Sequence, residues 1–275
     1  MTEEMVNSSL EELQKHFFLE ELEACLSIDG ESGYEETIRK HVLERLESYV
    51  DHLTLDRKGN ILAQRSCGTG KGPVILLNAH LDTVYGFEEG REILKHGAVW
   101  SSSKGILGAD DRAGVSVLLE LGRRMDEFQF NGTVKFIFTV EEEIGLIGAK
   151  NIDSHFLRDV DAAFVADRRG SGDIITKGGG IQFCTEAFGT WIQELAKDAG
   201  LEGWKCRAGG SSDTKIWATH GIQSVNLSVG YQNEHTSEEY LNTDACYGAF
   251  SLLKGIFEKG KHLKRIVKPL ESRKK

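Results

Sequence analysis

The 275-residue sequence lacks several features that would identify whole classes of protein. It has no excess of basic residues: the formal net charge is -10, which argues against nucleic-acid binding, because phosphate contacts need a clustered basic surface. The only basic run, Lys259 to Lys275, is expected to be a solvated tail. No apolar run is long enough to span a membrane, and the acidic start MTEEMVNSSLEEL lacks the positive and apolar segments of a signal peptide.

The sequence has few cysteines, and they are scattered along the chain. The cysteines are odd in number and form no CxxC pair, so we expect neither a disulfide scaffold nor a cysteine-ligated zinc site. A reducing cytoplasm is the compartment that this usage predicts. The five positions are Cys25, Cys67, Cys184, Cys206 and Cys246.

Familiar catalytic motifs are absent too. AGGSSDT has Asp213 where the GxSxG elbow of a serine hydrolase needs glycine. No HExxH is present, which excludes the helical zinc-protease site. SCGTGKGP fails the spacing of a phosphate loop, and TKGGGIQF is too loose for a dinucleotide fingerprint. The loop with Gly210 and Ser211 is either a plain turn or a source of backbone hydrogen-bond donors to a ligand.

The sequence does contain alternating helical and extended patterns. Apolar residues at helical spacing predict helices over residues 10–26, 113–125, 188–199 and 245–257, and another that starts from the capping-box pattern Ser32 to Glu35. Runs rich in β-branched residues predict strands at 74–77, 133–140, 161–167 and 224–230, and a hairpin that turns at Lys58-Gly59-Asn60. With 40% hydrophobic residues and no linker, residues 1–275 are expected to form one domain. We predict a single-domain three-layer α/β/α fold with a mixed, mostly parallel sheet.

Side chains of the types that bind metal ions follow four of these strands. Ligand sites of open α/β sheets lie beyond the carboxyl ends of the strands, so these residues should gather there. A strand that ends in His-x-Asp also places both side chains on one side, although a strand-end histidine beside a solvated aspartate would look the same. The residues are His80, Asp82, Glu141 to Glu143, Asp167 and His235.

A glycine-rich segment, GILGADDRAG, supplies two more carboxylates, Asp110 and Asp111. One of them is expected to cap the following helix, which leaves the other free. Two histidines with a surplus of carboxylates suit zinc, and also cobalt or manganese. The set is too large for one ion, so two ions that share a bridging carboxylate fit better. An isolated acidic turn is the alternative explanation for Glu141 to Glu143.

Five motifs in this order resemble the co-catalytic dinuclear zinc exopeptidases, a clan that includes peptidase T, the aminoacylase and carboxypeptidase relatives and lidless zinc aminopeptidases. They are NAHLDTV, GADDRAG, TVEEEIGLIGAK, ADRRGSGDI and GYQNEHTSEE, and the resemblance extends from about Ser32 to Glu239. Each motif is weak alone, and together they are specific.

The resemblance implies a role for each of the residues selected above. It implies two divalent ions, zinc first, with Asp110 as the shared ligand. Asp82 would orient the His80 imidazole, and Glu142 would act as general base and then general acid. The implied ligands of the two ions are His80, Asp110 and Asp167 for the first, and Asp110, Glu143 and His235 for the second.

Two departures from that pattern limit the resemblance. Many relatives insert a lid or dimerisation domain after the aspartate ligand, but the stretch from Asp167 to Gly209 is shorter than the roughly 50 residues that a domain needs. We therefore expect no lid, and any oligomer must form without one. Arg168 and Arg169 follow the ligand aspartate directly. One interpretation is that both are surface arginines in salt bridges. The alternative, which applies to Arg169 above all, is a clamp on a substrate carboxylate.

Three functions remain open. The favoured one is an aminopeptidase that acts on short peptides, with selectivity from a small pocket near a free amino terminus. An amidohydrolase on N-acyl amino acids would use the same metals, and a non-catalytic binding module is the third possibility. No nucleic-acid or membrane partner is expected. The loops expected to shape an open site are Tyr85 to Glu92, Arg168 to Asp173, Gly178 to Phe183 and Gly209 to Asp213.

Overall fold

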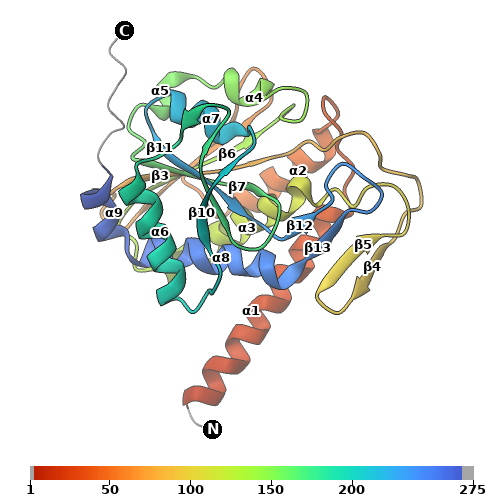
Figure 1. Cartoon of the computed structure of the whole chain (residues 1–275), viewed down its shortest axis with the longest axis horizontal. Coiled ribbons are helices and arrows are strands. Elements are labelled where there is room, and N and C mark those ends of the chain that lie inside the picture. Colours follow the sequence, from red (N-terminus) through yellow and green to blue (C-terminus); the bar gives the residue numbers. More distant parts are fainter. Residues whose placement is uncertain (1–2, 268–275) are drawn as a thin grey trace.

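The computed structural model describes residues 3–267, with side chains from residue 10 onward. Within this range the framework is a nine-stranded mixed sheet (Figure 1). Its strands lie in the order β1 (His52–Leu55), β2 (Ile61–Cys67), β6 (Gly132–Thr139), β3 (Val74–His80), β7 (Ala162–Arg168), β11 (Gln223–Ser228), β8 (Asp173–Gly178) and β10 (Lys205–Gly209), with β9 (Ile181–Gln182) paired to β8. The central strands β6, β3, β7 and β11 run parallel to one another.

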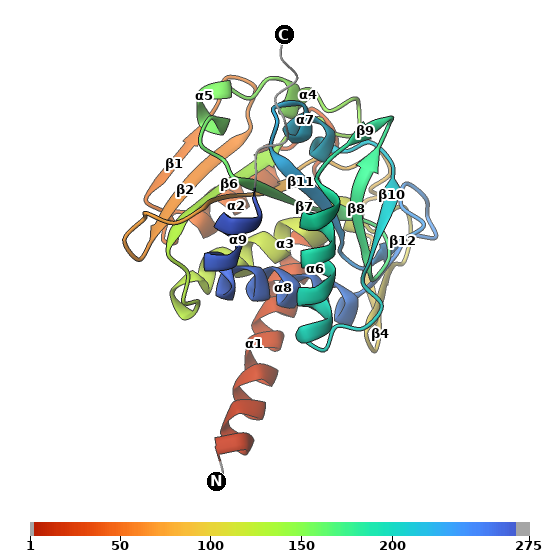
Figure 2. The ribbon, with the colours of Figure 1, turned by 60° about the vertical axis from the view of Figure 1, so that its left-hand side comes forward.

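Helices cover both faces of this sheet (Figures 1 and 2). One face packs against α1 (Glu3–Leu26), α2 (Glu36–Leu46), α3 (Ala109–Arg123) with the short 3-10 turn η1 (Met125–Glu127), α6 (Glu186–Asp198), α8 (Thr243–Glu258) and α9 (Gly260–Ile266). The other face carries α4 (Ile147–Lys150), α5 (Ser154–Leu157) and α7 (Asp213–Thr219). Successive residues of β3 alternate between the two cores, with Ile75 and Leu77 in one and Leu76 in the other. The predicted α/β sheet covered on both faces is confirmed.

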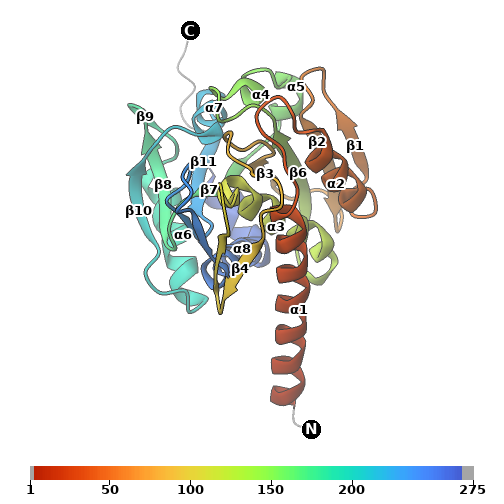
Figure 3. The same cartoon turned by 90° about the vertical axis from the view of Figure 1, so that its right-hand side faces the viewer.

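Two features lie outside this three-layer body. A small antiparallel sheet consists of β12 (Tyr231–Gln232), β13 (Tyr240–Asn242), β5 (Val99–Ser102) and β4 (Ile93–His96). The N-terminal part of α1 projects away from the rest of the molecule (Figure 3). Its apolar residues Leu10, Leu13 and Phe17 are exposed, whereas Phe18 and Leu22 are buried in the core.

Most predicted elements are present, with shifted ends. The β1–β2 hairpin and the four central strands are confirmed, and α1 starts earlier than expected, at Glu3. The capping box is wrong: the hydroxyl of Ser32 donates to Asp82 at 2.7 Å, and α2 begins at Glu36 without a side-chain cap. Between residues 3 and 267 no helix is both long and apolar enough to cross a bilayer, and all five cysteines are free thiols. Of the basic C-terminal run, residues 268–275 lie outside the described part.

Candidate metal centre

The carboxyl ends of three parallel strands, β6, β3 and β7, lie together at one end of the sheet. His80, the last residue of β3, lies opposite Thr139 of β6, and Asn78 lies opposite Val165 of β7. The chain leaving each strand therefore enters the same space. Glu142 and Glu143 follow β6, and Asp167 is the last residue but one of β7, as the pattern of strand ends predicted.

A first group of potential metal ligands consists of His80, Asp110 and Asp167, whose ligand atoms lie within 4.8 Å of one another. The Nε2 atom of His80 is 3.1 Å from Asp110 Oδ1 and 3.5 Å from Asp167 Oδ1. All three side chains are almost fully buried.

A second group shares one member with the first. The Nε2 atom of His235 lies 3.1 Å from Asp110 Oδ2 and 2.8 Å from Glu143 Oε1. Asp110 thus presents one carboxylate oxygen to each histidine. This is the arrangement that a carboxylate shared by two cations requires.

The local fold around Asp110 fixes its position. Asp110 and Asp111 have non-helical dihedral angles at the start of α3, so their side chains do not follow the regular helical spacing. Asp111 accepts hydrogen bonds from the backbone N–H groups of His80 and Gly114, which is the capping role expected of one of the pair. Gly114 is required here because a Cβ atom would lie 1.9 Å from the carbonyl oxygen of Ala166.

Asp82 contacts more than the histidine it was expected to orient. The Nδ1 atom of His80 is 2.9 Å from the Asp82 carbonyl oxygen and 3.4 Å from its carboxylate. The carboxylate also accepts the backbone N–H groups of Glu142 and Glu143, at 2.9 and 3.1 Å. Burial alone would raise the pKa of Asp82, but the hydrogen bonds from His80 and Ser32 lower it.

Electrostatics fit a cation at this centre. Burial, with further contributions from the charges of Asp110 and Glu143, raises the pKa of Asp167 to about 7 against the opposing effect of His80. Burial also raises the pKa of Glu142 to about 10; the charge of His80 lowers it, and those of Asp167 and Asp213 add to the rise. Hydrogen bonds to Asp110 and Glu143 raise the pKa of His235 to about 10. Crowded, buried carboxylates gain most from a bound positive charge, and two imidazoles with three carboxylates suit zinc, cobalt or manganese.

A pocket of about 300 Å³ opens beside these residues. Its lining includes Glu142, Arg169, Gly210 and Ser211, so the sequence-selected substrate candidates lie together. Arg168 pairs with Asp173, and Arg169, which is half exposed, pairs with Glu234 at 2.9 Å. Among the described residues, the loops 168–173 and 209–213 contribute to this lining, and the loops 85–92 and 178–183 do not.

Sequence reasoning missed three residues that support the centre. The Glu239 carboxylate accepts the backbone N–H groups of Gly108 and Asp110, at 2.7 and 3.0 Å. Asn226 bonds both backbone groups of Asp167, and the Tyr231 hydroxyl donates to the Asp167 carboxylate. The second glutamate of SEE and the asparagine in SVNLS are in the sequence, but neither stands out without the fold.

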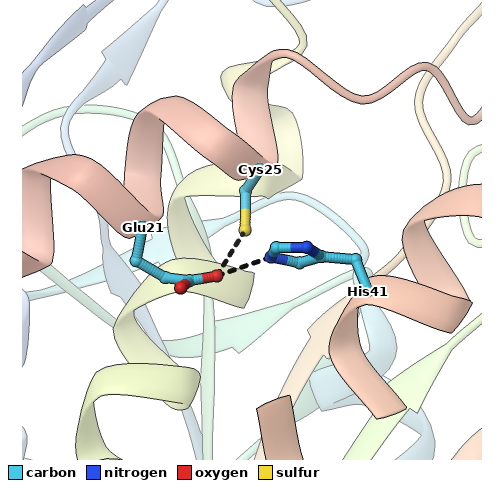
Figure 4. A group of neighbouring side chains, drawn as sticks. All are labelled: Glu21, Cys25 and His41. Carbon is cyan, nitrogen blue, oxygen red and sulfur yellow. Dashed lines mark hydrogen bonds and ion pairs between the residues drawn. The ribbon is translucent and has the colours of Figure 1, made fainter. Parts of the chain in front are cut away.

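A third potential ligand group, Glu21, Cys25 and His41, lies on α1 and α2 and shares no residue with the first two (Figure 4). Its carboxylate is already paired with His41 at 2.6 Å and with Arg45 at 2.8 Å. Burial above all raises the pKa of the Cys25 thiol to about 12, so it stays protonated. We interpret this group as a hydrogen-bonded contact between two helices, because its charges are balanced without an ion.

An α/β sheet with a histidine- and carboxylate-rich centre at its strand ends is typical of metal-dependent hydrolases. A family model for M42 glutamyl aminopeptidases matches residues 86–252, more than half of the chain. The chain belongs to the M42 glutamyl aminopeptidase family, and the resemblance to metal-dependent exopeptidases is confirmed.

Individual relatives support the same fold and clan. The chain is 26% identical to the cytosol non-specific dipeptidase of Escherichia coli over 76% of its own length and 43% of that protein. It is 30% identical to a putative [LysW]-lysine/[LysW]-ornithine hydrolase of Pyrococcus furiosus over 49% of its length and 37% of that protein. A tripeptidase from Staphylococcus aureus superimposes with a TM-score of 0.78 at 21% identity, covering 90% of this chain and 99% of that one, which shows a shared fold. The chain thus matches less than half the length of these two curated relatives.

Proposed function

We propose that this chain is a dinuclear metal-dependent aminopeptidase that removes the first residue of short peptides. The observation that carries the proposal is the shared carboxylate of Asp110, with one oxygen toward His80 and the other toward His235. His80, Asp110 and Asp167 would hold one divalent ion, and Asp110, Glu143 and His235 the other. Zinc is the first choice, with cobalt or manganese as alternatives.

Two such ions, when bound, would lower the pKa of a water molecule and polarise an amide carbonyl. The chain itself supplies the proton transfer. Glu142 lines the same pocket as residues of the two ligand groups, and burial raises the pKa of its carboxyl group. It would accept a proton from the attacking water and return it to the leaving amine. Asp82 fixes the backbone of Glu142, so the carboxylate has a defined starting position.

The substrate side of the proposal rests on the pocket. Arg169 has guanidinium N–H groups beyond the one paired with Glu234, and these would bind a carboxylate of the substrate. Backbone groups of Gly210 and Ser211 would bind the peptide main chain. The segment between Asp167 and Gly209 forms β8, β9, α6 and β10, all joined to the main sheet and its helices, which supports a single catalytic domain without a lid. An open site of this kind should accept peptides of several lengths.

An amidohydrolase acting on N-acyl amino acids is the second candidate. Its support is the likeness to the putative [LysW]-lysine/[LysW]-ornithine hydrolase, a relative whose name describes a different amide substrate. The same ligand groups would serve both reactions.

The test compares a di-, tri- and pentapeptide series that shares one first residue with the same peptides N-acetylated, in the presence of zinc, cobalt or manganese. Comparable cleavage rates across length, with loss on acetylation, would support the aminopeptidase. Preference for the acetylated compounds would support the amidohydrolase. Cleavage of neither set with any metal would contradict both candidates.

A further inference from the structure

The two ligand groups are supported unequally by the rest of the protein. His80, Asp110 and Asp167 are each exposed by less than a tenth of their side-chain surface, whereas 44% of the His235 side chain is exposed. The described contacts of the His235 ring are with Asp110 and Glu143 alone. The Asp167 carboxylate of the first group, by contrast, accepts a hydrogen bond from Tyr231, a residue that belongs to neither group.

Tyr231 is the outside residue that reaches a ligand carboxylate of the first group. Its side chain is buried, and its hydroxyl donates a hydrogen bond of 3.0 Å to Asp167 Oδ1. This is the same oxygen that lies 3.5 Å from His80 Nε2. Asn226 fixes only the backbone of Asp167, through bonds of 3.0 and 2.6 Å. A carboxylate rotates easily about its terminal bond, so the Tyr231 hydroxyl, together with His80, restricts the orientation of that oxygen.

We propose that Tyr231 is a positioning residue: by holding Asp167 Oδ1 it strengthens the binding of the ion at the first group. This inference rests on the proposed metal centre. Hydrogen-bond partners of ligating carboxylates typically change metal affinity or activity about 10–100-fold when they are removed.

The position of Tyr231 in the chain links the two groups. Its carbonyl oxygen accepts the N–H of Gly170 at 2.8 Å, which ties its strand to the loop that follows Asp167. The same short segment continues to His235, the exposed ligand of the second group. One segment therefore supplies a ligand to the second group and orients a ligand of the first.

The experiment measures ion binding rather than turnover. Wild type and Tyr231→Phe are freed of metal with a chelator, and zinc binding is followed by calorimetry and cobalt binding by visible absorption. We expect the affinity of one of the two ions to fall about 10–100-fold, with little change in the other. Tyr247→Phe removes the hydroxyl of a partly buried tyrosine that packs against Phe18 and Phe250, and it should bind metal as the wild type does.

A double-mutant cycle separates positioning from general damage. Tyr231→Phe should have little effect in an Asp167→Asn background, because the carboxylate it orients is already gone. Equal losses in both backgrounds, or unchanged binding of both ions in Tyr231→Phe, would overturn the inference. A wild type that binds one ion would contradict the two-ion centre, while a loss of affinity for that ion in Tyr231→Phe would still support the role of Tyr231.

Discussion

The carboxylate of Asp82 lies 2.9 Å from the backbone nitrogen of Glu142 and accepts its hydrogen bond. Its other oxygen accepts hydrogen bonds from the backbone N–H of Glu143 and from the hydroxyl of Ser32. One buried carboxylate therefore joins the end of β3, the loop after β6 and the segment before α2. A residue chosen in the sequence as the partner of a histidine also fixes the backbone that carries the proposed base.

Replacing Asp82 by Asn should impair both catalysis and metal binding. The new amide NH₂ would face a backbone N–H or the Ser32 hydroxyl, so at least one of the present hydrogen bonds is lost. Partners of this kind change metal affinity or activity about 10–100-fold. Asp56→Asn is the matched control, because Asp56 also accepts backbone N–H groups but does so in the β1–β2 turn. Equal, small effects of the two variants would show that the Asp82 contacts have no special role.

Glu142→Gln should separate metal binding from turnover. The substitution keeps the shape of the side chain and removes its basicity, so kcat should fall about 10²–10⁴-fold while ion content is unchanged. Glu143→Gln should instead weaken ion binding, because its carboxylate faces His235 at 2.8 Å. Glu141→Gln, which loses only a pairing with Lys58, is the control for the acidic run. Near wild-type turnover in a fully loaded Glu142→Gln enzyme would require another base.

Asp110→Ala should impair both ion sites together. The purified wild type is expected to hold up to two divalent ions, and removal of the shared carboxylate takes a ligand from each group. Elemental analysis of the dialysed proteins measures this. Cys25→Ser should leave the ion content unchanged, because the Glu21, Cys25 and His41 group is paired without metal. One ion in the active wild type that persists in Asp110→Ala would contradict a shared ligand.

Glu21→Ala should destabilise the contact between α1 and α2. It leaves His41 and Arg45 without their partner, at a cost of about 1–3 kcal/mol in the free energy of unfolding. Burial tends to raise the pKa of Glu21, but the hydrogen bonds and charges of His41 and Arg45 prevail, and the net shift is downward. A lowered pKa in the folded state stabilises the protein above the unfolded pKa, about 4.3, and this stabilisation disappears as the pH falls through the folded value.

The difference in stability between wild type and Glu21→Ala should therefore shrink in acid. Denaturant unfolding at pH 7 and at pH 3–4 measures it. Glu20→Ala is the control, because its side chain is exposed and pairs only with His16. A difference that grows as the pH falls would contradict this sign.

Local patterns predicted the central strands and the residues at their ends. The apolar run before His80 and the run TVKFIFTV are buried on both faces of the sheet, so their signal needs no knowledge of distant contacts. The position of Asp110 between two histidines came from the resemblance to a family rather than from spacing. Strands such as β10, whose residues Lys205–Gly209 are mostly exposed, carry no such pattern and were missed.

The supporting contacts were beyond prediction because they join residues far apart in the chain. Ser32 looked like a helix cap, yet its hydroxyl bonds to Asp82, 50 positions away. Glu239 reaches the backbone of Asp110 across 129 positions. Hydrogen bonds of this kind depend on how the elements pack, and they produce no periodic pattern in a single sequence.

The order of the ligands along the chain has a consequence for synthesis. Residues 80, 110 and 167 complete the first group early, whereas the second group waits for residue 235, which follows four further strands of the main sheet. Because a chain is made from its N-terminus, a product that stops before His235 would contain every proposed ligand of one ion and only part of the proposed set for the other.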